Sequence, residues 1–266
     1  MASIVRLFLD HPLAPAQSVP LSQAQAHYLF GVMRLSVGAE LRVFNGQSGE
    51  WRAEVELAGK RRGVLRVVES TRAQQDPPDV WLLFAPLKKA RTDFIVEKAV
   101  ELGAARICPV QTQFTNAERV RQDRLQAHAV EAAEQCGGTF VPPVEELQRL
   151  DRVLADWPAD RLLMFCDESL AARSSVLSSL LADGGESAVR VDDAGKVEEG
   201  RKDRGDTPGP WAILIGPEGG FSEAERARLS DLPFTRAVSL GPRILRADTA
   251  AVAALTLWQS IYGDWR

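Results

Sequence analysis

The feature that most restricts the fold of this chain is an apolar run that stops at a glycine-rich turn. The run is Trp211 to Ile215, and it is followed by Gly216-Pro217-Glu218-Gly219-Gly220 and then by Ser222 to Glu225, where a helix start is expected. A strand, a tight turn and a helix in this order are typical of α/β proteins, in which ligands bind beyond the carboxyl ends of the strands. The stretch therefore predicts both a fold class and a place for a site.

Apolar strands alternate with helices throughout the C-terminal part of the chain, which predicts a mostly parallel α/β sheet over residues 79–266. Strands are expected at 80–84, 107–110, 161–166, 211–215 and 237–240, and helices at 92–102, 124–136, 170–182, from 222, and up to about 262. Phe94, Ile95, Ala99 and Leu102 are expected on the inward face of the first helix. Residues 183–209 are rich in Gly and charged residues, so a flexible insertion is expected there.

The N-terminal part, residues 1–73, has a different pattern. Strands are expected at 4–9, 41–44, 51–57 and 63–68, with a hairpin signal at Asn45-Gly46 and a helix from Ser22 to Leu35. These elements predict a small β-barrel with one helix. Two prolines and polar residues at 74–78 indicate a linker to the second domain.

Composition excludes several other classes of protein. The chain has 266 residues, 45% of them hydrophobic, yet no apolar stretch is long enough to span a bilayer, and Asp10 interrupts the N-terminal run before it could act as a signal peptide. The three cysteines lie far apart without a CxxC pair, and the three histidines are scattered. We therefore expect a cytoplasmic protein without disulfides, metal or membrane.

Charge gives conflicting evidence on whether the chain binds nucleic acid. The net charge is −4 and the pI is about 5.6, which argues weakly against nucleic-acid binding. Two compact basic clusters, at 59–63 and 88–91, could bind phosphate groups, and they could equally be a solvated hairpin tip and a helix start.

A second turn has the same layout as the first. Residues 239–250, SLGPRILRADTA, again give a strand end, a Gly-Pro turn and a helix. No lysine follows Gly220, Glu218 would repel phosphate, and the chain has no GxGxxG, so a triphosphate or dinucleotide is disfavoured. A nucleoside with a sulfonium group, such as S-adenosylmethionine, would tolerate the carboxylate. Two ordinary strand-to-helix turns would have the same pattern.

Five stretches together point to a known family: His27-Tyr28-Leu29 with Val32 to Leu35 and Gly38, Phe94 with Glu97 to Gly103, Glu131 to Cys136 with Val141-Pro142, LIGPEGGFSEAE, and LGPRILRADTA. Through them the chain resembles the RsmE family, the 16S ribosomal RNA uridine-N3 methyltransferases of the SPOUT superfamily. The resemblance implies a PUA-like RNA-binding barrel and a SPOUT α/β domain with a C-terminal trefoil knot. It also implies S-adenosylmethionine as methyl donor, the small ribosomal subunit as partner, and a homodimer that builds the site from both chains.

The resemblance also implies site residues. One wall of the donor site would be formed by Ile215, Gly216, Pro217, Gly219 and Gly220, and the other by Leu240, Gly241, Ile244 and Leu245, with Asp167 and Glu168 at the edge. RNA contacts are expected from Arg34, Lys60, Arg61, Arg62, Lys88, Lys89 and Arg91.

Arg246 and Arg243 are the candidates to stabilise the negative charge on the uracil oxygens during methyl transfer. Glu218 and Asp248 are candidates to accept the N3 proton. Alternatively, Arg246 could pair with Asp248 or Glu218, and Asp248 could serve a helix N-terminus.

Two departures from the family pattern leave alternatives open. Gly138 stands where the family has Arg, and Asp248 stands where it has Glu. The first removes a cation, so a ribosome-binding or assembly factor without catalysis is one alternative. A SPOUT methyltransferase acting on another RNA is the other.

Overall fold

The computed structural model describes residues 4–117, 119–171, 190–191, 197–198 and 209–265. It divides into two compact units, Met1–Pro77 with Gln126–Pro142 and Pro78–Leu125 with Pro143–Arg266. Residues 172–182 of the helix expected at 170–182 and most of the insertion expected at 183–209 lie outside the described residues. Within that insertion, β10 (Arg190–Val191) and β11 (Val197–Glu198) pair antiparallel.

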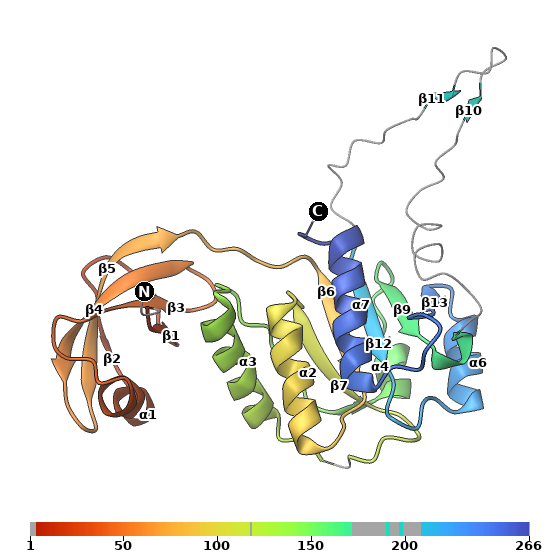
Figure 1. The fold of residues 1–266 in the computed structure, drawn as a ribbon, viewed down its shortest axis with the longest axis horizontal. Helices are drawn as coiled ribbons and strands as arrows, with labels where there is room; N and C mark the ends of the chain where they lie inside the picture. Colours follow the sequence, from red (N-terminus) through yellow and green to blue (C-terminus); the bar gives the residue numbers. More distant parts are fainter. Residues whose placement is uncertain (1–3, 118, 172–189, 192–196, 199–208, 266) are drawn as a thin grey trace. The chain divides into compact units, whose positions relative to one another are not determined.

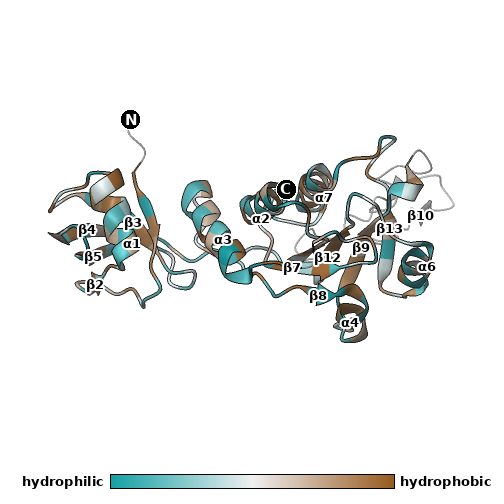
Figure 2. Ribbon diagram, turned by 90° about the horizontal axis from the view of Figure 1, so that it is seen from below, coloured by the Kyte–Doolittle hydropathy of each residue, from teal (hydrophilic) through white to brown (hydrophobic). Residues whose placement is uncertain are grey.

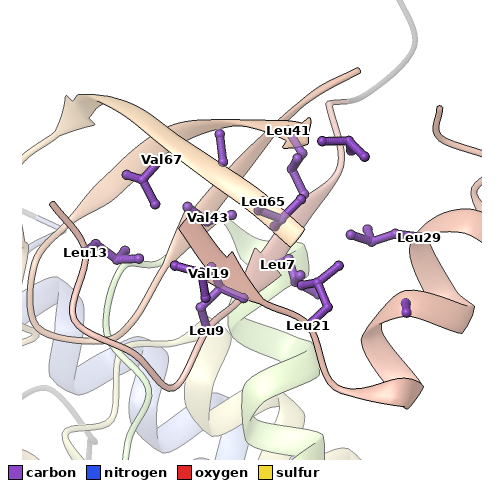
Figure 3. Close-up of a cluster of buried hydrophobic side chains, with 13 residues drawn as sticks. Leu7, Leu9, Leu13, Val19, Leu21, Leu29, Leu41, Val43, Leu65 and Val67 are labelled. Atoms are coloured by element: carbon purple, nitrogen blue, oxygen red, sulfur yellow. The ribbon is translucent and has the colours of Figure 1, made fainter. Parts of the chain in front are cut away.

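The N-terminal unit contains a curled five-stranded sheet that forms a PUA-like half-barrel, in agreement with the small barrel expected. Its strands, in sheet order, are β1 (Arg6–Phe8), β3 (Glu40–Phe44), β4 (Glu50–Ala58), β5 (Gly63–Arg72) and β2 (Ser18–Pro20). The pair β1–β3 is parallel and the other pairs are antiparallel. Figure 3 shows leucines and valines from these strands and from the segments that flank them, with Leu29 from the helical segment, gathered into one buried cluster. This apolar cluster inside the curl is what the alternation of residues in β4 predicts.

One local prediction in this unit needs correction. The helix expected at 22–35 is shorter and in two parts, α1 (Gln23–Ala26) and the π-helix η1 (His27–Val32). The hairpin expected at Asn45-Gly46 is confirmed, because β3 and β4 pair antiparallel, and its connection has five residues, since Phe44 pairs with Glu50. The Asn45 side chain accepts hydrogen bonds from the backbone of Gln47 and Ser48, so the loop is closed by an Asx turn.

The C-terminal end of α3 (Gln122–Cys136) belongs to the same unit as the curled sheet. Arg6 donates from Nη1 to the carbonyls of Ala133 and Glu134, and from Nη2 to that of Gly138. Glu134 in turn accepts a hydrogen bond from the backbone N–H of Phe8 at 2.8 Å. Carbonyl groups at the C-terminal end of α3, which have no partner within the helix, thus accept hydrogen bonds from the guanidinium of Arg6 in β1.

The C-terminal unit is built on a six-stranded parallel sheet, as the alternating pattern predicts. Its strands, in sheet order, are β13 (Thr235–Val238), β9 (Leu162–Cys166), β12 (Trp211–Ile215), β6 (Val80–Phe84), β7 (Arg106–Gln111) and β8 (Gln148–Arg149). Every pair in this order is parallel. All strands therefore end at the same edge of the sheet.

Helices cover both faces of this sheet (Figures 1 and 2). On one face, α2 (Lys89–Glu101) and α7 (Ala247–Ile261) lie side by side, and α7 contacts β12. On the other, Leu150 and Leu154 of α4 (Leu150–Ala155) and Leu229 of α6 (Glu223–Asp231) join the apolar cluster of the strands. Burial on both faces explains why all five residues of β12 are apolar and buried.

One prediction in this unit needs correction, namely that Phe94 lies on the inward face of its helix. Phe94 is 39% exposed, whereas the buried residues of α2 are Thr92, Ile95, Val96, Ala99 and Val100. Short elements were not expected at all, namely β2, β8 and α4. The trefoil knot stays a prediction.

Candidate functional site

A cavity of about 260 Å³ lies at the carboxyl ends of three neighbouring strands, β9, β12 and β13. Both predicted turns line it, so the structure brings together two segments that the sequence only suggested were adjacent. Its lining residues are Cys166, Asp167, Glu168, Ala171, Ile215, Gly216, Pro217, Glu218, Gly220, Ser239, Leu240, Gly241, Arg243, Ile244, Leu245, Arg246, Ala247 and Ala250. Of the expected donor-site residues, Gly219 alone is absent from this lining.

The first turn closes through a hydrogen bond from Gly220 N to Pro217 O at 2.9 Å. Gly220 has φ +69°, and a Cβ there would collide with Glu168. The ring of Phe221 lies 2.5 Å from where a Cβ of Gly216 would be, so any side chain at position 216 would collide with that ring. Ser222 and Glu225 then form a capping box that starts α6, as the sequence predicts.

The second turn presents side chains rather than backbone to solvent. Arg243 and Arg246 are exposed, and Ile244 is 76% exposed. Ser239 is buried and exchanges hydrogen bonds of 3.3 Å with the backbone of Gly241, which fixes the start of the turn. Arg246 is the N-cap residue of α7, without a side-chain cap. Two guanidinium groups therefore stand at the mouth of the cavity.

Arg91 links the two turns. From the first turn of α2, its Nη1 donates to the carboxylate of Glu218, and its Nε lies 3.6 Å from Oδ2 of Asp248. Among the described residues, Arg91 contacts both of the carboxylates with which Arg246 could have paired. Glu218 thus has a cationic partner from outside the two turns.

A second group of charges lies behind Gly220. Asp167 and Glu168 follow β9, and Asp167 caps the short 3-10 helix η2 (Glu168–Leu170) by accepting from the N–H and hydroxyl of Ser169. Arg226 of α6 contacts Glu168 through Nη2 and lies 3.3 Å from Asp167 through Nε. No role for Arg226 was predicted from the sequence. Its position four residues after Ser222 nevertheless predicts that these two residues lie on the same face of α6.

Cys166 forms part of the lining as a neutral group. Burial raises the pKa of its thiol to about 12, so the thiol stays protonated at neutral pH. The thiol therefore contributes to the cavity wall as a neutral group rather than as a thiolate. Across the residues that the structure describes, no cluster of His, Cys, Asp or Glu is suited to hold a metal ion.

Most of the cations expected to contact RNA are exposed. Lys60, Arg61 and Arg62 form the tip between β4 and β5, and Arg34 follows η1 with a left-handed φ of 57°. Lys88 and Lys89 are exposed at the start of α2, next to Arg91. None of the helices in the described ranges has the length and apolar character to cross a membrane.

A parallel sheet covered by helices, with a cavity at its carboxyl edge, is the class of α/β protein that binds small ligands at strand ends. Two family models match the chain: an RNA methyltransferase domain over residues 74–259 and an RNA methyltransferase PUA domain over residues 21–68. The chain therefore belongs to the RNA methyltransferase domain family. Within that family it belongs with the proteins named ribosomal RNA small subunit methyltransferase E, to which it is similar over most of its length.

Curated relatives with that name span nearly the whole chain. The protein from Rickettsia conorii is 28% identical over 253 residues, covering 94% of this chain and 93% of its own length. That from Mycobacterium tuberculosis is 32% identical over 232 residues, covering 84% and 79%. The family resemblance drawn from the five sequence stretches is confirmed.

Solved structures agree with the fold. A ribosomal RNA small subunit methyltransferase E from Neisseria gonorrhoeae bound to S-adenosylmethionine has a TM-score of 0.80 at 25% identity, covering 99% of this chain and all of that chain. A putative methyltransferase from Legionella pneumophila in complex with the same cofactor has a TM-score of 0.82 at 26% identity, with the same coverage.

Proposed function

We propose that this chain transfers the methyl group of S-adenosylmethionine to N3 of a uridine in 16S ribosomal RNA. The observation that carries the proposal is the cavity at the ends of β9, β12 and β13, lined by the two turns of the family motifs. Membership of the family and the donor named for two similar structures support it. We expect it to act in the cytoplasm on the small ribosomal subunit.

The residues of the cavity suit this donor. Glycine backbone and apolar side chains such as Leu240 and Leu245 fit an adenine ring, and the carboxylates of the lining are compatible with a positive sulfonium. Three carboxylates, of Asp167, Glu168 and Glu218, line the described part of the cavity and would repel a polyphosphate group. When bound, S-adenosylmethionine supplies an electrophilic methyl group.

Arg246 and Arg243 have a defined task in this reaction. Uracil N3 gives its proton to Asp248, the other candidate acceptor, or to water at or before attack, and negative charge then spreads onto O2 and O4. The exposed guanidinium groups at the mouth can donate forked hydrogen bonds to these oxygens. Glu218 is held by Arg91, which supports a positioning role for Glu218 rather than proton acceptance.

The exposed cations provide the RNA-binding surface of the proposal. Lys60, Arg61 and Arg62 would contact phosphate groups from the hairpin tip, with Arg34 in the same unit, and Lys88 and Lys89 would do so from the other unit. We also propose a homodimer, as the resemblance to the family implies.

Two measurements test the function. Titration calorimetry with S-adenosylmethionine should give saturable heat, and its absence would favour the non-catalytic assembly factor. Sequencing of small-subunit RNA from cells lacking the gene should show loss of N3-methyluridine. If that nucleotide persists unchanged while another methylated nucleotide disappears, the chain modifies a different RNA position.

Arg246→Ala tests the proposed catalytic group. Turnover should fall by about 100- to 1,000-fold, because one charge-stabilising donor is lost, while S-adenosylmethionine still binds. Arg228→Ala is the matched control, since Arg228 is exposed on α6 outside the cavity lining. An equal loss of turnover and donor affinity in Arg246→Ala would give Arg246 a structural role only.

A further inference from the structure

We infer that Glu168 binds the sugar hydroxyls of the methyl donor and that Arg226 is the positioning residue that holds its carboxylate. The inference rests on the proposed donor site and adds one specific contact to it. It starts from a charged group in the cavity wall that methyl transfer itself does not require.

Glu168 and its neighbour Asp167 have different surroundings. The side chain of Asp167 is 8% exposed, and its two oxygens accept hydrogen bonds from the N–H and hydroxyl of Ser169, at 2.9 Å and 2.8 Å. These bonds serve the local turn. The side chain of Glu168 is 30% exposed and lines the cavity beside Gly220. Of the two carboxylates, Glu168 is the one available to a ligand.

Arg226 fixes the orientation of the Glu168 carboxylate. Its Nη2 contacts Oε1 of Glu168, while its Nε lies 3.3 Å from Asp167. Because Arg226 projects from α6, it joins the helix that follows the first turn to the end of β9. The lack of a side chain at Gly220 provides the space, since a Cβ there would meet Glu168 and lie 3.2 Å from Nη2 of Arg226. The glycine therefore serves the ion pair as well as the turn.

The carboxylate of Glu168 keeps acceptor positions that the ion pair does not use. Arg226 serves both Asp167 and Glu168, so the three groups keep a net negative charge, and the ligand comparison below distinguishes a sugar hydroxyl from the cationic amino group of the donor. A carboxylate offers about four acceptor positions, and Arg226 contacts Oε1 only. Among the described residues, none donates a hydrogen bond to Oε2 of Glu168. A ribose provides two adjacent hydroxyl donors, and acidic residues bind ribose hydroxyls in the same way in dinucleotide sites.

Calorimetry with three kinds of ligand tests this contact. The probes are S-adenosylhomocysteine, methylthioadenosine, which keeps the sugar but lacks the amino acid, and analogues of methylthioadenosine that lack one sugar hydroxyl. Glu168→Ala should weaken the first two by the same factor, about 10- to 100-fold, as expected for hydrogen bonds to a charged group. It should also abolish the preference for the complete sugar that the wild-type protein has.

Arg226 variants separate positioning from general stability. Arg226→Ala should reduce the preference for the complete sugar by a smaller factor, and Arg226→Lys should restore part of it. Glu223→Ala, exposed in the first turn of the same helix, should keep wild-type affinities. If Glu168→Ala fails to fold, Glu168→Gln replaces it, because it keeps the side-chain volume. The measured quantity is again the preference for the ligand with the complete sugar.

Three results would overturn the inference. One is a Glu168 variant that keeps the full wild-type preference for the complete sugar. Another is loss of affinity for S-adenosylhomocysteine alone, which would place the carboxylate at the amino group of the donor. The third is a wild-type protein that binds neither parent ligand, and that result would reject the proposed donor site as well.

Discussion

Glu218, at the centre of the first turn, is bound by a residue from a distant part of the chain. The contact with Arg91 spans 127 positions, and Arg91 also approaches Asp248 in the second turn. The turns themselves were predictable, because glycine, proline and a capping box are local signals. Their shared cation was not, since no sequence pattern marks a pair of this separation.

Arg91→Ala should lower the affinity for S-adenosylmethionine by about tenfold, roughly 1.4 kcal/mol, because the two turns lose their common partner. Arg91→Lys should restore little of it, since an ammonium cannot replace a planar fork that spans two carboxylates. Calorimetry measures both, with Lys98→Ala in the same helix as control. Unchanged donor binding with weaker RNA binding would instead assign Arg91 to phosphate contact, as the sequence suggests.

Long elements with a clear hydrophobic period could be predicted from the sequence, and very short elements could not. The buried stripe of α2 follows the spacing i, i+3, i+4, i+7, i+8 from Thr92 to Val100. Phe94 is off this stripe, and the ammonium of Lys98 lies over its ring at 5.5 Å from the centroid. The strands β2 and β8 have three and two residues, too few for a period to be visible.

The end of α3 depends on Arg6, whose side chain is only 13% exposed. Arg6→Ala removes three hydrogen bonds to carbonyls and the ion pair with Glu50, so the free energy of unfolding should fall by about 2–4 kcal/mol. Arg66→Ala, at an exposed pair with Glu54, should change it by less than about 1 kcal/mol. Denaturant melts compare the two, and equal effects would contradict a special role for Arg6.

Glu134 makes the stability of this region depend on pH. Burial raises the pKa of its carboxyl, although the hydrogen bond from the N–H of Phe8 acts in the opposite direction. A folded-state pKa above the unfolded value means that the folded state holds the proton more tightly, so this group costs stability as the pH rises past that range.

Glu134→Gln should therefore raise the melting temperature at neutral pH, because it removes the buried charge and keeps an oxygen for the N–H of Phe8. The gain should vanish below about pH 4, where the wild-type carboxyl is protonated as well. Thermal melts across pH measure the difference. A gain that persists at low pH would show that charge is not its cause.

At the scale of the whole molecule, RNA binding and donor binding use different parts of the chain in this proposal. Replacing Lys60, Arg61 and Arg62 by Ala should lower the slope of log affinity for RNA against log salt by about two, because up to three phosphate contacts are lost. Donor affinity should stay the same. Replacing Arg121 and Arg149, which are exposed but paired with Asp123 and Asp151, should leave the slope unchanged. An unaltered slope in the triple variant would remove the tip from the RNA surface.

The cavity is assembled from strand ends that are widely spaced along the chain, from Cys166 through Ile215 to Ala250. Closing such long-range contacts is slow, and during synthesis the cavity cannot exist until Ala250 and the helix after it have left the ribosome. A donor that binds only the finished cavity stabilises the folded state by about 2.7 kcal/mol at a hundred times its dissociation constant. The methyl donor would then act as a late folding ligand, and its cellular supply would set how much of the newly made enzyme persists.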